Sequence, residues 1–167
     1  MAELAFGTDG WRAIIADEFT YANVRRVASA IAGHVVARHG TSRPVLVGHD
    51  TRFMARDFAR TVVGVLQHHG LEAHLAVRDV PTPVIAHAAQ AIPTAGAVML
   101  TASHNPPQYC GIKYIPEYAG PATKEITDAI VAGIRPLSED LAAVPAADGK
   151  AFDPEPAYKA EVLARFD

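Results

Sequence analysis

The sequence predicts an α/β fold, a three-layer α/β/α sandwich with a mostly parallel sheet. Short apolar runs at residues 44–48, 72–77 and 96–100 have the length and composition of buried strands. Segments with helical periodicity stand between these runs, so strand and helix alternate as they do in βαβ units. Parallel strands present their carboxyl ends at one edge of a sheet, which is where ligands bind in open α/β folds.

Local signals mark the ends of the first helices. Thr20 is placed to cap a helix over residues 20–39, and Gly40 stands where a left-handed C-terminal cap is expected. A later helix is expected over residues 84–91, with Thr82 as its N-cap and a proline at its first position. These signals agree with the alternation of strands and helices.

The domain organisation follows from changes in composition along the chain. We expect an α/β domain over residues 1–137, with a further short strand at 113–116 and a helix over 123–134. Residues 138–156 are rich in Pro, Ala and Asp and are expected to form a connector. Helical patterning returns at residues 157–167, which we interpret as the truncated start of a second domain.

Composition limits the classes of function. The 167 residues suffice for one domain with a real core, and the net charge of −3 gives no reason to expect a nucleic-acid partner. We find no signal peptide and no apolar run of membrane-helix length, so we expect a cytoplasmic protein without a membrane partner. Cys110, the one cysteine, is most simply a small buried hydrophobe, with a minor role in a site as the alternative.

The most informative stretch is residues 96–107, which read GAVMLTASHNPP. The apolar run predicts a buried strand, and Asn-Pro-Pro forces the chain out of it. Ser103 and His104 therefore come just after the carboxyl end of that strand, and Lys113 follows ten residues after the serine. In the alternative interpretation, Ser103 and Asn105 are turn or helix caps and His104 is an ordinary surface histidine.

Two arginines add positive charge to this candidate site. Arg12 follows a turn bracketed by two glycines, and it reaches the edge of the sheet only if residues 7–12 fold over as a loop. It is otherwise a surface arginine. Arg52 comes directly after the strand at 44–48, and Asp50 either caps the next helix or orients Arg52.

A serine among cations suits phosphate better than an acyl group. Arginine makes bidentate, charge-assisted hydrogen bonds to phosphate, and a cationic rim offsets the charge of a phosphoserine. The chain contains no Gly-x-Ser-x-Gly, no Walker A and no Gly-x-Gly-x-x-Gly string. Arg12, Arg52, Asn105 and Lys113 are thus candidate phosphate-binding residues.

Residues 101–106, TASHNP, resemble the active-site serine signature of the α-D-phosphohexomutases, the phosphoglucomutase/phosphomannomutase superfamily. The strings FGTDGWR at 6–12, VGHDTR at 47–52 and GIK at 111–113 match the same family in order and spacing. The resemblance covers roughly residues 5–135 and implies the family's N-terminal domain I, with its phosphohexomutase domain I fold. Residue 158 onward resembles the start of the second domain.

The resemblance implies an isomerase, an intramolecular phosphotransferase that interconverts hexose 1-phosphates and 6-phosphates through a hexose 1,6-bisphosphate. Ser103 is then the phosphoserine that donates and recovers the phosphoryl group, and Mg²⁺ is held partly through that phosphate. Arg12 and Lys113 match positions implicated in proton transfer and charge stabilisation, and His104 matches a supporting position.

The family's aspartate-rich metal-binding string and its sugar-recognition loops do not occur in these 167 residues. We therefore expect the remaining domains of the same polypeptide to supply most Mg²⁺ ligands and to bind the phosphosugar, and this chain alone to be inactive. A phosphoglucosamine mutase is the alternative within the family, although Thr101 fits the glucose and mannose branches better. A non-catalytic phosphate- or nucleotide-binding α/β module is the alternative outside it.

Overall fold

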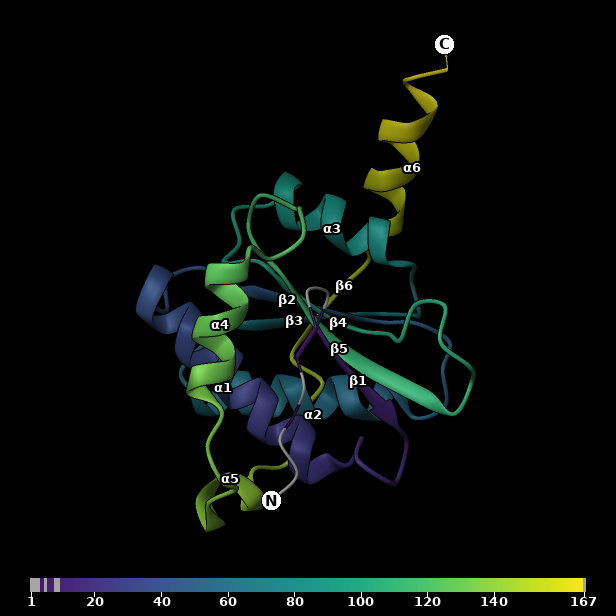
Figure 1. Ribbon diagram of the computed structural model, residues 1–167. Helices are drawn as coiled ribbons and strands as arrows, with labels where there is room; N and C mark the ends of the chain where they lie inside the picture. The colour runs from purple at the N-terminus through teal and green to yellow at the C-terminus, as the bar shows by residue number, and fades with distance from the viewer. Residues whose placement is uncertain (1–3, 5, 8–9, 167) are drawn as a thin grey trace.

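The strands of the computed structural model, which describes residues 4, 6–7 and 10–166, form one mixed sheet (Figure 1). In chain order they are β1 (Trp11–Ile14), β2 (Val45–His49), β3 (Ala73–Ala76), β4 (Ala97–Leu100), β5 (Tyr109–Ile115) and β6 (Lys150–Phe152). Across the six-stranded sheet their order is β1-β5-β4-β2-β3-β6.

The sheet is parallel from β4 to β6 and antiparallel at its other side. β2 pairs in parallel with β3 and β4, and β6 pairs in parallel with β3. β5 runs antiparallel to both β4 and β1. Only residues 101–108 connect β4 to β5, and so short a connection cannot make the crossover that a parallel pair needs.

Helices cover both faces of the sheet, which confirms the α/β fold class (Figure 1). One face carries α1 (Tyr21–His39) and α2 (Ala55–His68), with α4 (Lys124–Gly133) and α5 (Glu139–Ala143) against α1. The other face carries α3 (Thr82–Ala91), which α6 (Glu155–Leu163) contacts. Figure 1 shows α6 projecting from the body of the domain.

The caps of α1 are as predicted, whereas that of α3 is not. The Asn23 amide donates to the Thr20 hydroxyl at 3.3 Å, and Gly40 ends α1 with a positive φ of 67°. At α3 the cap is the extended Pro81, so Thr82 is the first helical residue and makes no side-chain cap bond. The prediction of Thr82 as N-cap was wrong by one residue.

The segment expected as a connector is built into the domain. Residues 138–156 contain α5 and the edge strand β6, whose Ala151 pairs with Leu75 of β3. Arg60 of α2 also binds Asp148 through its Nε at 2.7 Å. Composition alone missed this because an edge strand of three residues has too few positions to show an apolar alternation.

An aromatic cluster fixes the elements that lead to the candidate site. The Trp11 ring of β1 stacks on Phe19 with centroids 4.7 Å apart, and Phe19 meets Phe58 of α2 edge-on at 4.8 Å. All three side chains are buried, and truncating such an aromatic costs about 3–5 kcal/mol. The cluster therefore holds β1 and the start of α2 in fixed positions. No helix of the described residues is long and apolar enough to cross a membrane.

Candidate functional site

The predicted site residues gather where β2 and β4 end. The amide of Asp50, just past β2, donates to the carbonyl of Leu100, the last residue of β4, at 3.0 Å. The next segment, residues 101–108, is called the serine loop below and returns the chain to β5. This edge holds the carboxyl ends of two parallel strands, as predicted.

A tight turn presents Ser103 to solvent. Its backbone lies in the left-handed region with φ of 54°, which is uncommon for a residue with a side chain. The Ser103 amide donates to the Thr101 hydroxyl at 3.0 Å, and the Asn105 amide donates to the Ala102 carbonyl at 3.0 Å. Ser103 and His104 are both exposed. The turn thus leaves the serine side chain open to a ligand.

Arg52 lies beneath this turn with its side chain only 13% exposed. Its guanidinium donates to the carbonyl oxygens of four residues of the loop and its end, at 2.8 to 2.9 Å: Ser103, Asn105, Pro106 and Tyr109. The sequence predicted that Arg52 would contact phosphate. In the structure its guanidinium faces backbone carbonyl oxygens.

Asp50 orients Arg52 and is not a helix cap. One carboxylate oxygen accepts from the Arg52 amide at 3.0 Å, and the other lies 3.3 Å from the Arg52 Nε. Helix α2 begins later, with Met54 as its cap. Of the two alternatives that the sequence left open, the structure selects the orienting role.

Arg12 reaches the site along a strand and not through a loop. It is paired with Gly111 in the antiparallel β1–β5 ladder, and its Nη1 donates to the Asn105 side-chain oxygen at 3.3 Å. A methyl group on Gly111 would lie 2.9 Å from the Arg12 Cγ, so the glycine makes room for the arginine to cross β5. The structure therefore brings Arg12 and Asn105 together.

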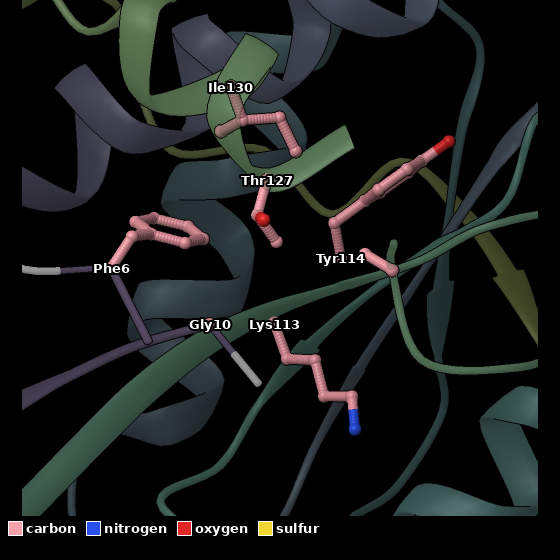
Figure 2. A pocket seen from close by; sticks show the side chains of 7 residues that line it. Phe6, Gly10, Lys113, Tyr114, Thr127 and Ile130 are labelled. Carbon is pink, nitrogen blue, oxygen red and sulfur yellow. The ribbon is translucent and has the colours of Figure 1, made fainter. Parts of the chain in front are cut away.

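Lys113 shares a face of the sheet with Arg12. Side chains alternate along a strand, and Trp11, Ile112 and Tyr114 pack in the core on the α1 side. Arg12 and Lys113 consequently point to the other side. Figure 2 shows the Lys113 side chain extending away from Ile130 and Thr127 of α4. Lys113 and Arg12 are both half-buried.

The cavity beside Lys113 is too small to be the binding site (Figure 2). Its volume of about 10 Å³ is at the lower limit for one water molecule. Gly10 is one of the residues that line it, and a side chain there would lie 2.3 Å from the Ile112 carbonyl oxygen. A ligand must therefore approach Ser103 from the open edge of the sheet.

Cys110 takes no part in the site. The side chain is fully buried in β5, and burial raises the pKa of the thiol to about 12. The thiol stays protonated at neutral pH and is a poor nucleophile. This confirms the interpretation of Cys110 as a small buried hydrophobe.

Sequence reasoning missed two contributors to the site. Thr101 ties down the Ser103 amide, and Gly111 makes room for Arg12. The signal for Thr101 was its spacing, because a threonine two residues before an amide commonly forms such a turn. Gly111 had no local signal, since its need for space comes from β1, about a hundred residues earlier.

The described residues do not form a metal site by themselves. They contain no group of three or more His, Cys, Asp or Glu side chains that could hold a metal ion. Asp50 is engaged by Arg52. A phosphate on Ser103 would offer one oxygen ligand, so a magnesium ion would need further ligands from outside this part of the chain.

Comparisons with known proteins identify relatives along most of the chain. The phosphoglucomutase/phosphomannomutase alpha/beta/alpha domain I family matches residues 3–140. A phosphoglucomutase of Komagataeibacter xylinus is 32% identical over 136 residues, covering 76% of this chain and 24% of the relative. A phosphoglucosamine mutase of Clostridium botulinum (strain Kyoto) is 35% identical over 146 residues, covering 87% of this chain and 31% of the relative. The chain thus spans a quarter to a third of these relatives.

Solved structures share the fold. A Thermus thermophilus protein assigned to the phosphomannomutases is 39% identical, with a TM-score of 0.91 over 99% of this chain and 37% of its own. The Paramecium phosphoglucomutase pp63/parafusin is 20% identical, with a TM-score of 0.83 over 100% of this chain and 36% of its own, and this likeness concerns the fold alone.

Proposed function

The chain belongs to the phosphoglucomutase/phosphomannomutase family as its α/β/α domain I, and from that premise we propose that it is the phosphoryl-carrying domain of a phosphohexomutase. The observation that carries the proposal is the exposed Ser103, held in a left-handed turn at the ligand-binding edge of the sheet. That conformation turns the chain out of β4, so the serine side chain stands at the edge of the sheet and open to solvent.

In the proposed reaction, phospho-Ser103 gives its phosphoryl group to a free hydroxyl of a hexose monophosphate. The bond from phosphorus to the serine oxygen breaks, a bond to the sugar oxygen forms, and the hydroxyl proton passes through a base of the site to the departing serine oxygen. The resulting hexose 1,6-bisphosphate returns its other phosphoryl group to Ser103, and the serine proton goes to the departing sugar oxygen. Atoms balance over the cycle, and the net result is isomerisation.

The neighbouring residues would act mainly through charge. Phosphoryl transfer is largely positioning plus charge neutralisation. We assign charge stabilisation to Arg12 and Lys113, which share a face of the sheet, with Lys113 as the candidate base. Arg12 also donates a hydrogen bond to the Asn105 side chain, and this bond joins the Arg12 guanidinium to the serine loop. His104, exposed beside Ser103, has a supporting role at the phosphate.

We propose that magnesium and the sugar are bound chiefly by further domains of the same polypeptide. The absence of a metal-binding cluster among the described residues supports this, as do the exposed apolar side chains of Leu163 and Phe166. Relatives named for glucose and for glucosamine match at similar identity. This supports a domain that carries the shared phosphoryl step, with the choice of sugar made elsewhere.

The test is phosphoryl uptake at Ser103. The chain is incubated with glucose 1,6-bisphosphate, and intact mass and peptide sequencing locate any phosphoryl group. We expect one group, on Ser103, and none in the Ser103→Ala variant, whose circular dichroism should match the parent because Ser103 is exposed. An unlabelled serine together with tight nucleotide binding would instead establish a non-catalytic binding module.

A further inference from the structure

The terminal N–H groups of the Arg52 guanidinium already serve backbone carbonyls. An arginine side chain has five N–H groups. The two on Nη1 serve the carbonyls of Pro106 and Tyr109, and the two on Nη2 serve those of Ser103 and Asn105. The fifth, on Nε, faces the Asp50 carboxylate at 3.3 Å. A phosphate could bind Arg52 only by displacing part of the serine loop.

The support beneath the loop is itself anchored to the sheet. Asp50 receives the Arg52 amide and donates its own amide to Leu100 at the end of β4. Arg52 therefore connects the ends of two central strands to the middle of the serine loop, where the Arg12 bond to the Asn105 side chain is a further link to the sheet. The other backbone bonds of the loop hold its two ends, from the Thr101 amide to the Gly111 carbonyl at 3.0 Å and from the Ile15 amide to the Gln108 carbonyl at 2.8 Å. Between these ends, the bonds from Asn105 to Ala102 and from Tyr109 to Pro106 are local.

Arg52 also determines which side of the loop is electronegative. The peptide bonds are trans, so a carbonyl that points toward Arg52 sends the following N–H the opposite way. The Ser103 carbonyl thus directs the His104 N–H away from Arg52. The carbonyls of Asn105 and Pro106 also bind Arg52. The residues that follow them are Pro106 and Pro107, and a proline has no N–H to direct toward the other side.

A phosphoryl group on Ser103 carries about −1.5 to −2 charges near neutral pH. Carbonyl oxygens facing it would oppose it, whereas a backbone N–H would favour it. Arg52 takes up four carbonyl oxygens with one cation, and this removes that opposition.

From these contacts we infer that Arg52 is a positioning residue, which holds the serine loop in the conformation that receives and keeps the phosphoryl group. It acts through the loop and does not touch the phosphate. The inference rests on the proposed function of Ser103. It also revises the expectation that Arg52 binds phosphate.

Arg52→Lys tests this, because lysine keeps the charge and loses the planar fork. Arg56→Lys is the matched control, since Arg56 is exposed on α2 four residues away. Hydrogen exchange of the 101–111 amides and the rate of phosphoryl uptake from glucose 1,6-bisphosphate are measured for both, with circular dichroism to verify the fold. The dependence of uptake on bisphosphate concentration is recorded as well.

In Arg52→Lys we expect loop amides to exchange at least about 10-fold faster, since charge-assisted bonds are lost. Maximal uptake should fall roughly 100-fold, the scale of a misplaced reacting group. The bisphosphate concentration that gives half-maximal uptake should stay the same, and Arg56→Lys should behave as wild type. An unchanged loop with a raised half-maximal concentration would mean that Arg52 contacts phosphate, and unchanged exchange and uptake would equally overturn the inference.

Two further measurements keep the outcomes distinct. If Arg52→Lys fails to fold, Asp50→Asn replaces it, because that change weakens the orientation of Arg52 and leaves the guanidinium in place. It should accelerate loop exchange in the same direction, and no acceleration would overturn the inference. A wild-type chain that takes up no phosphoryl group would overturn the proposed function and the catalytic part of this inference, while hydrogen exchange would still decide whether Arg52 holds the loop.

Discussion

A methyl group at position 111 should damage both the sheet and the site. In Gly111→Ala the new carbon would lie 2.5 Å from the Thr101 carbonyl oxygen, 2.9 Å from the Trp11 carbonyl oxygen and 2.9 Å from the Arg12 Cγ. The first two are backbone atoms flanking β5, so neither can rotate away. Overpacking of this kind costs typically about 1–3 kcal/mol. We expect about 3 kcal/mol, because two of the three contacts are rigid, and a melting temperature lower by about 6–12 °C.

Thermal and urea denaturation followed by circular dichroism measure this cost. Gly33→Ala is the matched control, since a methyl group there meets nothing within 4 Å and α1 gains a better helix former. That variant should gain up to about 1 kcal/mol. Gly111→Ala should also slow phosphoryl uptake by Ser103, because Arg12 must move. A melting temperature for Gly111→Ala equal to or above wild type would show that Arg12 does not cross β5 as described.

Three other outcomes are expected. Because burial raises the pKa of Cys110 to about 12, its thiol should resist alkylation at about pH 8 in the folded chain and react on unfolding in urea; rapid labelling under native conditions would contradict its burial. Burial, and then the charge of Arg38, lower the pKa of His34 in the folded chain. The unfolded state therefore binds the proton more tightly, and the free energy of unfolding should fall as the pH drops below about 6.5. His34→Gln should flatten this dependence, measured by urea titration at several pH values, and an equally steep dependence in the variant would assign it to other groups. The chain alone should give no sustained turnover in a coupled glucose 1-phosphate assay, and robust turnover that depends on Ser103 would refute the need for further domains.

The features that the sequence determined by itself are local ones. Thr20 and Gly40 bound α1 because a cap acts through the first or last turn of its own helix. Ser103 was placed at the end of a buried strand because Asn-Pro-Pro cannot continue a strand. These predictions needed only neighbouring residues, and the structure places the elements where they were expected.

The tertiary structure alone decided the features that depend on partners distant in the chain. β5 was expected as a short strand at residues 113–116, but it begins at Tyr109 and runs antiparallel. That direction brings β1 beside it and carries Arg12 to Asn105 along a strand, where the sequence allowed only a folded loop or a surface position. Which strands pair is a long-range choice that no local pattern specifies.

The role of Arg52 shows the same division most clearly. The sequence placed a cation at the correct edge of the sheet, because it follows a buried strand directly. It could not show that the guanidinium would meet the backbone carbonyls of a loop some fifty residues later, since carbonyl groups occur at every residue and leave no mark in the sequence. The charge of the site could thus be predicted from residue types, whereas the direction in which each charge points depended on the folded chain.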